Sequence, residues 1–317
     1  MLPVIALASW TTPAHALDSE VYGWDWSRTH RFYLESRVQL PTVMWFATPY
    51  NHQARVAGFD LRLNTTCGDA EINTRRTVEV SCTLDDVALS AEALPQEAGK
   101  LQPILTELDD MLTGAVVQLV VNRDGRITNI DLEGLERRNR RMGAINENLR
   151  LVLTRAFAGL DFELPDDPAL EQWAEYDSWL MRAPAADGSA GSSQVVHQLA
   201  DKQGGFATFV SAGRAVIVPG EGFNKFDTRL TGSTTFDLRN GRISDRTWTV
   251  VGGPTASSWL ANGAAGYPYI QEGRVVALGQ GQTWDVGESL EVPPDQRIPT
   301  AIQQGGPGEL MGLNPNR

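Results

Sequence analysis

Residues 115–134, AVVQLVVNRDGRITNIDLEG, decide the fold class, because their turn chemistry and their apolar pattern agree. Asp124-Gly125 offers two adjacent residues that tolerate positive φ, which predicts a β-hairpin with a type I′ turn. Counting outward from that turn pairs Val121 with Thr128, Leu119 with Ile130, and Val117 with Leu132. The apolar residues then share one face, and the polar residues Gln118, Asn122, Asn129 and Asp131 share the other. The hairpin therefore predicts an antiparallel sheet with one buried face.

A second predicted hairpin, formed by residues 54–67 and 76–88, holds the only two cysteines, Cys67 and Cys82. Cys67 alternates in phase with Leu61 and Leu63, and Cys82 alternates in phase with Val80, so antiparallel pairing places both thiols on one face. We expect them to form a structural disulfide. Neither cysteine lies in a CxxC motif and no histidine is close in sequence, so the spacing does not indicate a metal site.

Helical periodicity is confined to the N-terminal half. Apolar residues recur at helical spacing at Leu101, Ile104, Leu105, Leu108, Met111 and Leu112, with Pro103 tolerated in the first turn. A second helix is predicted over 136–158, with a buried stripe of Ile145, Leu149, Val152, Ala156 and Leu160 and a stop at Gly159. A third is predicted to open at Asp167-Pro168 and to carry Leu170, Trp173, Trp179 and Leu180.

The C-terminal half alternates between short strands and turns. We expect strands at 194–200, 206–218, 226–239, 242–251, 267–278 and 283–292. The predicted fold class is α+β, with antiparallel meander-like sheets and two or three helices inserted in the N-terminal half. The predicted organisation is a signal peptide at 1–16, an α+β region at 17–182, a linker at 183–193, a β-rich region at 194–298 and a flexible tail at 299–317.

A short internal likeness links the two halves. The sequence RDGRIT at 123–128 resembles RNGRIS at 239–244, but Leu238 aligns with the polar Asn122. A phase difference of one residue turns the opposite set of side chains inward. We interpret the likeness as shared hairpin chemistry, with an ancient duplication as the alternative.

The first sixteen residues, MLPVIALASWTTPAHA, are typical of the end of a secretory signal peptide. The apolar stretch is too short to span a bilayer, and Ala14 and Ala16 suit signal peptidase, so we expect a mature chain that begins at Leu17. A buried strand is the alternative. No later segment is apolar for long enough to span a membrane as a helix. The predicted location is the periplasm or the extracellular medium, which also favours the disulfide.

Charge and motif content disfavour several functions. The net charge of −12 disfavours nucleic-acid binding. We find no nucleophile elbow, zinc-protease helix or phosphate loop, and predict no cofactor and no metal. The adjacent carboxylate pairs are Asp85-Asp86, Asp109-Asp110 and Asp166-Asp167, whose members point apart on a strand or helix. The cluster Arg137, Arg138, Arg140 and Arg141 is interpreted as a solvated helix face, because Glu133 and Glu136 precede arginines by four residues.

Three residues remain as candidates for ligand binding. Trp24 and Trp26 lie on one face if their segment is extended, and His197 lies on a predicted strand. For each of them, packing in the core is the competing interpretation, and no catalytic residue is assigned. We therefore predict a non-catalytic exported protein that binds a ligand or another envelope component. The alternatives are a carboxylate hydrolase of envelope polymers and a structural subunit of a secreted or surface assembly.

Overall fold

The computed structural model describes most of the chain between residues 23 and 287. The described residues are 23–47, 53–72, 74, 76–93, 97–122, 124–132, 143–164, 172–176, 178–181, 193–217, 226–254 and 269–287. The predicted signal peptide, residues 183–192 of the predicted linker, the arginine cluster and the tail lie outside them, so those predictions remain untested. Within the described residues, no helix is both long and apolar enough to cross a membrane.

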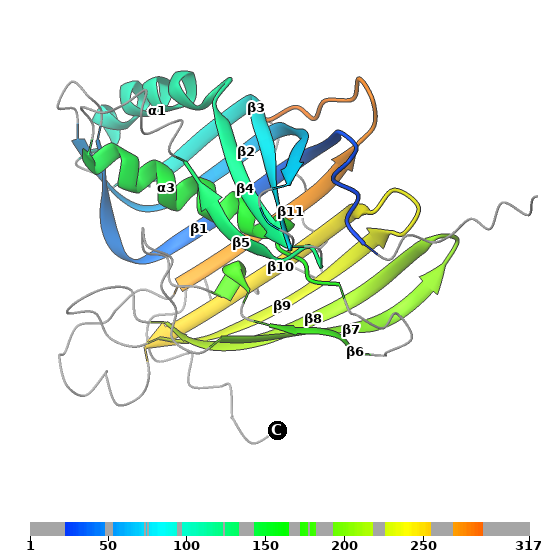
Figure 1. The fold of residues 1–317 in the computed structure, drawn as a ribbon. Helices are drawn as coiled ribbons and strands as arrows, with labels where there is room; N and C mark the ends of the chain where they lie inside the picture. Colours follow the sequence, from blue (N-terminus) through cyan, green and yellow to red (C-terminus); the bar gives the residue numbers. More distant parts are fainter. Residues whose placement is uncertain are drawn as a thin grey trace, which may run out of the picture.

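One antiparallel sheet of eleven strands organises these residues (Figure 1). Its strands are β1 (His30–Ala47), β2 (Gln53–Ile72), β3 (Thr77–Ala93), β4 (Val116–Asn122), β5 (Ile127–Asp131), β6 (Gln172–Tyr176), β7 (Ser193–Gln203), β8 (Phe206–Ile217), β9 (Phe226–Asp237), β10 (Arg242–Pro254) and β11 (Tyr269–Leu278). The order across the sheet is β5-β4-β3-β2-β1-β11-β10-β9-β8-β7-β6. The pairing of β1 with β11 therefore joins strands from both sides of residues 183–193 into one continuous sheet.

Among the residues that the structure describes, two α-helices accompany the eleven strands, and the fold there is mainly β. These are α1 (Ala98–Leu112), which packs on β3 and β2, and α3 (Gly143–Phe157), which packs on β1 and β2. Two short 3₁₀ turns, η2 (Ala158–Leu160) and η3 (Trp179–Met181), continue the covering towards β7–β11. Five of the six predicted apolar residues of α1 are buried, and Pro103 lies inside the helix because the helix begins at Ala98.

Side chains alternate between two faces along each strand, as a pleated strand requires. On β1, Phe32 and Leu34 belong to the main core, whereas Tyr33 and Glu35 point to the opposite side. We call the side of Phe32 and Leu34, which the helices cover, the inner face, and the side of Tyr33 the outer face. Register shifts interrupt six of the ten strand pairs, for example between Gln39 and Met44 of β1, and such bulges bend and twist strands. The bent sheet curls around the inner face (Figure 1).

The hairpin of β4 and β5 forms as expected but with a different turn. Leu119 pairs with Ile130, as predicted, but Val121 pairs with Ile127 because a bulge shifts the register. The Gly125 N–H donates to the Asn122 carbonyl, and only Gly125 among the described turn residues has positive φ, at 92°. The type I′ prediction is therefore wrong. A hairpin loop of three residues that is followed by a bulge needs only one residue in the left-handed region.

Two further predictions fail in the described residues. Residues 172–176 form the edge strand β6, where a third helix was predicted, and Trp179 lies in a 3₁₀ turn. Residues 283–287 are not in a strand. In both cases the local apolar pattern is short, and short runs do not distinguish helix from strand.

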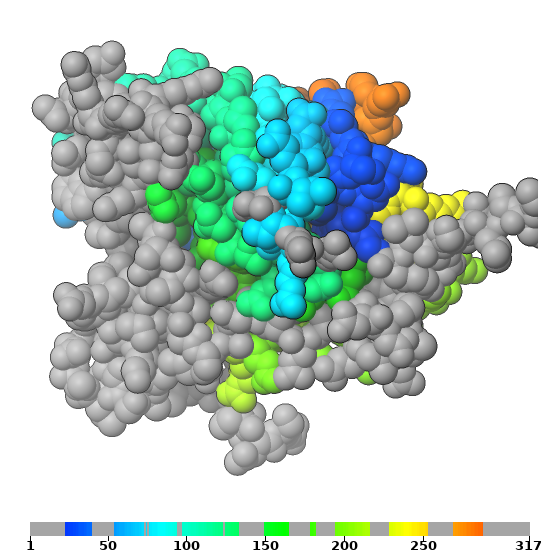
Figure 2. Space-filling view, in the orientation of Figure 1, coloured from blue at the N-terminus to red at the C-terminus, as the bar shows by residue number. Residues whose placement is uncertain are grey.

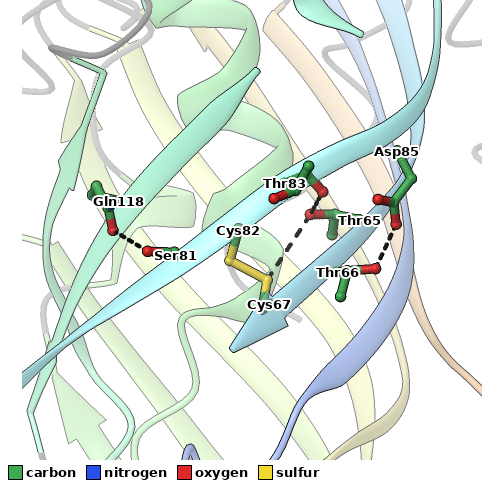
Figure 3. Close-up of a disulfide and its surroundings, with 8 residues drawn as sticks. All are labelled: Thr65, Thr66, Cys67, Ser81, Cys82, Thr83, Asp85 and Gln118. Atoms are coloured by element: carbon green, nitrogen blue, oxygen red, sulfur yellow. Dashed lines mark hydrogen bonds between the residues drawn. A yellow bond between two sulfur atoms is a disulfide. The ribbon is translucent and has the colours of Figure 1, made fainter. Parts of the chain in front are cut away.

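The predicted disulfide is confirmed. Cys67 and Cys82 face each other directly across β2 and β3, are bonded, and are fully buried (Figure 3). Thr65 beside them donates a hydrogen bond of 2.8 Å to the Thr83 carbonyl. Figure 2 shows β3, which carries Cys82, at the surface of the molecule beside α1 and β4. The cross-link thus fastens the long hairpin of β2 and β3 from its inner face.

Candidate ligand-binding site

A row of small and polar residues crosses the inner face from β7 to β1. Each member lies opposite the next on the neighbouring strand: His197, Ser211, Gly232, Trp248, Gly273 and Ser36. The Trp248 indole fills the space that Gly273 leaves, because a Cβ on Gly273 would stand 2.1 Å from its ring. Gly159 of η2 covers the same ring from the other side, at 2.5 Å by the same measure. The inner face is therefore closed over Trp248.

Phe162 brings together the three ligand-binding candidates of the sequence. Trp24 and Trp26 stack with ring centroids 4.7 Å apart, and the Trp24 indole donates a 3.0 Å hydrogen bond to the Phe162 carbonyl. The Phe162 ring lies 4.6 Å from the His197 imidazole. Trp24 and Trp26 are 9% and 6% exposed and His197 is fully buried, so all three belong to the interior. Their assignment to a ligand remains a proposal.

Asp161 connects the covering segment to the sheet edge. Its carboxylate accepts hydrogen bonds of 2.9 Å from the Ile127 N–H, the Ser178 hydroxyl and the Trp179 N–H. The Trp179 indole donates in turn to the Ile127 carbonyl at 2.6 Å. Burial raises the pKa of Asp161, although these hydrogen bonds and nearby Arg246 act in the opposite direction. Both outward-facing backbone groups of Ile127, at the open edge of β5, are thereby satisfied.

Arg246 of β10 holds η2 against the inner face. It is 1% exposed and donates to the carbonyls of Gly159 and Asp161 at 2.9 and 2.7 Å. Its guanidinium also lies over the Phe162 and Trp248 rings. A guanidinium in such a position satisfies several acceptors while its flat faces contact aromatic surface.

His197 sits deep in this interior. Its Nδ1 lies 2.7 Å from the Ser211 hydroxyl. Burial, followed by the charge of Arg246, holds the pKa of His197 well below its usual value, so the imidazole is neutral. The neutral, hydrogen-bonded imidazole packs against the Phe162 ring and is part of the buried core around it.

A second polar group lies where α3 meets β11. Gln271 Oε1 accepts a 2.7 Å hydrogen bond from Tyr269 and a 3.4 Å contact from Arg155 of α3. All three side chains are buried. Burial raises the pKa of the Tyr269 phenol, and Arg155 opposes that shift.

The outer face of the same central strands carries a lattice of alternating charges, which we call the outer lattice. Its six members lie on β2, β1 and β11. In one row an arginine lies between two acids, in the order Asp60, Arg37, Glu272, and in the next row an acid lies between two arginines, in the order Arg62, Glu35, Arg274. Arg62 Nε is 3.4 Å from Asp60 Oδ2, and Arg274 also bonds Asp245 at 2.6 Å. Burial raises the pKa of Asp60 and of Glu272, and the Glu35 charge adds to both shifts.

Residues 279–287 cross this outer face beside the lattice. The Asn64 side chain donates to the Trp284 carbonyl at 2.7 Å, and Arg62 donates to the Gly287 carbonyl at 3.0 Å. The Trp284 ring lies 5.8 Å from Tyr33, whose hydroxyl donates to Glu35 at 3.2 Å. The segment therefore shields one end of the lattice from solvent. No group of three or more His, Cys, Asp or Glu side chains suited to a metal occurs among the described residues.

Sequence reasoning missed most of these residues. Asp161, Arg246, Arg155 and Gln271 were not predicted, nor was the outer lattice. A bulge between Ile243 and Asp245 shifts the phase of β10, which turns Arg246 inward against the simple alternation from Ile243. The outer lattice had a weak signal, because Glu35, Arg37, Asp60, Arg62, Glu272 and Arg274 alternate with other residues on three strands. Their convergence depends on β1 pairing with β11, which the sequence does not indicate.

Comparison with known proteins gives no family. No family model matches the chain, and no curated protein matches it. Among solved structures, the chain is similar to one titled "Lipid-protein interactions in lipovitellin", with 8% identity and a TM-score of 0.42. That likeness covers 81% of this chain and only 25% of the other. A likeness at this level carries no argument about ligand or function.

Proposed function

We propose that this protein is an exported, non-catalytic component of the cell envelope that binds a ligand or another envelope component at its inner face. One observation carries the proposal: buried polar side chains are concentrated under one cover. They include His197, Arg246, Gln271, Arg155 and Asp161, all at most 1% exposed. Charged residues are rarely fully buried, and burying them costs stability. Such a concentration is expected where a site must present polar groups to a bound molecule.

The disulfide supports the proposed compartment. A buried cystine between β2 and β3 is typical of proteins that fold in an oxidising environment. The proposal allows either the periplasm or the extracellular medium as that environment.

Mass spectrometry of protein purified from its native envelope tests the proposal. We expect a small molecule or a second protein in near-stoichiometric amount, released when the chain is unfolded. The matched control is the same preparation after unfolding, washing and refolding, which should take the component back from an envelope extract. Native protein that carries no component, and that takes none from the extract, would contradict binding.

A carboxylate hydrolase of envelope polymers is the second candidate. The observation that favours it is the presence of Glu35, Asp60 and Glu272 in the outer lattice, with the pKa of two of them raised. Hydrolysis of a glycosidic bond needs one protonated and one ionised carboxyl group across the bond. Release of reducing ends from envelope polysaccharide by the native protein, abolished in Asp60→Asn and Glu272→Gln, would establish it. Equal turnover by these variants would reject the outer lattice as the site.

A further inference from the structure

Four buried, uncharged side chains on adjacent strands of the inner face carry a polar atom without a protein partner in the described structure. The atoms are Ser36 Oγ, Thr234 Oγ1, Trp248 Nε1 and Gln271 Nε2. Their residues are at most 3% exposed and lie on four adjacent strands, β1, β9, β10 and β11. Buried polar groups in folded proteins are nearly always satisfied, so four on one face require an explanation.

The strand register gathers Ser36, Trp248 and Gln271 into one patch, whereas Thr234 on β9 lies about 14 Å from Ser36, three strand spacings away. Trp248 and Ser36 both lie opposite Gly273, one on each side of β11. Gln271 is two residues from Gly273 on the same face, and Thr234 lies opposite Arg246, two residues from Trp248. The indole Cε2, which is bonded to Nε1, lies 2.6 Å from the position of a Cβ on Gly273. The N–H edge of Trp248 therefore lies over β11, next to Ser36 and Gln271.

The chemistry of the patch is that of hydrogen-bond donors. An indole N–H can only donate. The Gln271 amide is oriented by Tyr269 and Arg155, which both donate to Oε1, so its NH₂ group points away from them. The hydroxyl of Ser36 can rotate to donate. A complementary ligand group has acceptors only.

The neighbouring charges and apolar residues narrow the ligand further. Arg155 and Arg246 bring two buried positive charges to the patch, and the charge of Arg155 opposes the rise that burial causes in the pKa of Tyr269 beside Gln271. Arginine binds carboxylates with strong, charge-assisted hydrogen bonds. Buried apolar side chains flank the donors on both sides, namely Val38 and Val250 opposite Gln271, and Leu34 and Val275 in the next row. A group bound here continues into apolar surface.

We propose that the patch of Ser36, Trp248 and Gln271 binds the carboxylate of a ligand that has an apolar body. This deepens the proposed function, on which it rests, by naming the ligand class. Arg155 of α3 and Gly159 of η2 cover the patch, so the ligand enters when this cover lifts. The Arg155 contact to Gln271 is 3.4 Å long, at the weak end of hydrogen bonding, and a carboxylate replaces it with a stronger one.

The experiment titrates the whole protein, stripped of bound material, with decanoate. Two further probes test the two parts of the ligand separately. Acetate has the carboxylate without a long alkyl chain, and decyltrimethylammonium has the alkyl chain with a cationic group in place of the carboxylate. Binding is followed by calorimetry and by the indole N–H resonance of Trp248 in ¹⁵N-labelled protein. We expect saturable decanoate binding and a downfield shift of that one resonance, with acetate and the cation at least tenfold weaker.

Trp248→Phe keeps most of the ring and removes the donor. We expect it to weaken decanoate binding about tenfold, the effect of one hydrogen bond to a charged group. Trp284→Phe on the outer face is the matched control and should bind as the parent does. Because Trp248 is buried, the resonance shift in the unmutated protein gives a readout that does not depend on the variant folding.

Several outcomes overturn the proposal. These are absence of decanoate binding, binding that leaves the Trp248 resonance unmoved, equal binding of the cation or of acetate, and equal loss in both tryptophan variants. If native protein carries a component without a carboxylate and decanoate does not bind, the ligand class is wrong while the binding function stands. If neither experiment finds binding, both are wrong.

Discussion

The inner and outer faces of β1 and β11 handle polar groups in opposite ways. On the inner face, Gln271 and Ser36 lie beside apolar side chains, and each keeps a polar atom without a protein partner in the described structure. On the outer face of the same two strands, Glu35 and Arg274 lie in a lattice where each charge has opposite charges beside it. Exposed charge pairs contribute little to stability, whereas buried polar groups have large effects when they are disturbed. The comparison predicts that sensitivity to mutation differs sharply between faces built from the same strands.

The largest expected effect is that of Asp161→Ala. The change removes the acceptor of three buried donors, from Ile127, Ser178 and Trp179, and leaves them unsatisfied. We expect a loss of about 3–5 kcal/mol in the free energy of unfolding, measured by urea denaturation. The outer-face control Asp245→Ala breaks the half-buried pair with Arg274 and should cost at most about 1 kcal/mol. Equal costs would remove the distinction between the faces.

Gly125→Val should have the second-largest effect on the free energy of unfolding. Gly125 has φ of 92°, and a Cβ there would meet the Trp24 ring at 1.8 Å. Positive φ for a β-branched residue and displacement of a packed indole together predict a loss of about 2–4 kcal/mol in thermal or urea unfolding. Asn129→Thr in the same hairpin is exposed and should change stability by about 0.5 kcal/mol or less. If the asparagine variant is the more damaging, the inner face of the hairpin has been assigned backwards.

The outer lattice predicts a smaller effect that depends on salt. Arg37 is exposed and lies opposite Asp60 on one side and Glu272 on the other. Arg37→Gln should lower the free energy of unfolding by about 0.5–1 kcal/mol at low ionic strength. That difference should shrink towards zero in about 1 M NaCl, where charges are screened within a few ångströms. A loss that salt does not reduce would mean that Arg37 acts through packing.

Asp109 predicts an effect of another kind, a change in the pH dependence of stability. It accepts a 2.8 Å hydrogen bond from the Leu89 N–H, and burial raises its pKa to about 6. The folded state then favours the neutral acid, so this group's contribution to stability is greatest below pH 4. It falls as pH rises to about 6 and is constant above. Asp109→Asn should remove that part of the dependence between pH 4 and 7.

Asp110→Asn is the control for Asp109, because it removes one negative charge from the exposed side of the same helix. Unfolding in urea at a series of pH values gives the comparison. Identical pH profiles for the parent and Asp109→Asn would show that the Asp109 carboxyl group titrates alike in the folded and unfolded states.

How much of the fold the sequence could predict depends on how far apart in the sequence the interacting residues lie. Local alternation located the strands of the disulfide hairpin, and the facing of Cys67 and Cys82 followed from it. The loop around Asp124 was predicted one residue too short. A single bulge changes the type of turn there, and the amino-acid composition of the segment does not reveal the bulge. Arg246 was missed for the same reason on β10.

The candidate site was predicted only in part for a different reason. Trp24, Trp26 and His197 were singled out, but Phe162, which connects them, has no local signature. The row from His197 to Ser36 depends on five successive strand registers, one of them between β1 and β11, more than 200 residues apart in sequence. A pattern within one strand contains no information about such a partner.

The pairing of β1 with β11 also has a consequence for how the chain folds. The strands at the centre of the sheet are the first and the last that the structure describes, so the two half-sheets cannot join until nearly all of the described chain has emerged. Until then β1 and β10 each present an unpaired edge to other chains. Closing a loop of this length slows folding, and open edges promote aggregation in the interval. Assembly of this sheet is therefore a late event in folding, and protection of those two edges until β11 is available is a requirement of its biogenesis.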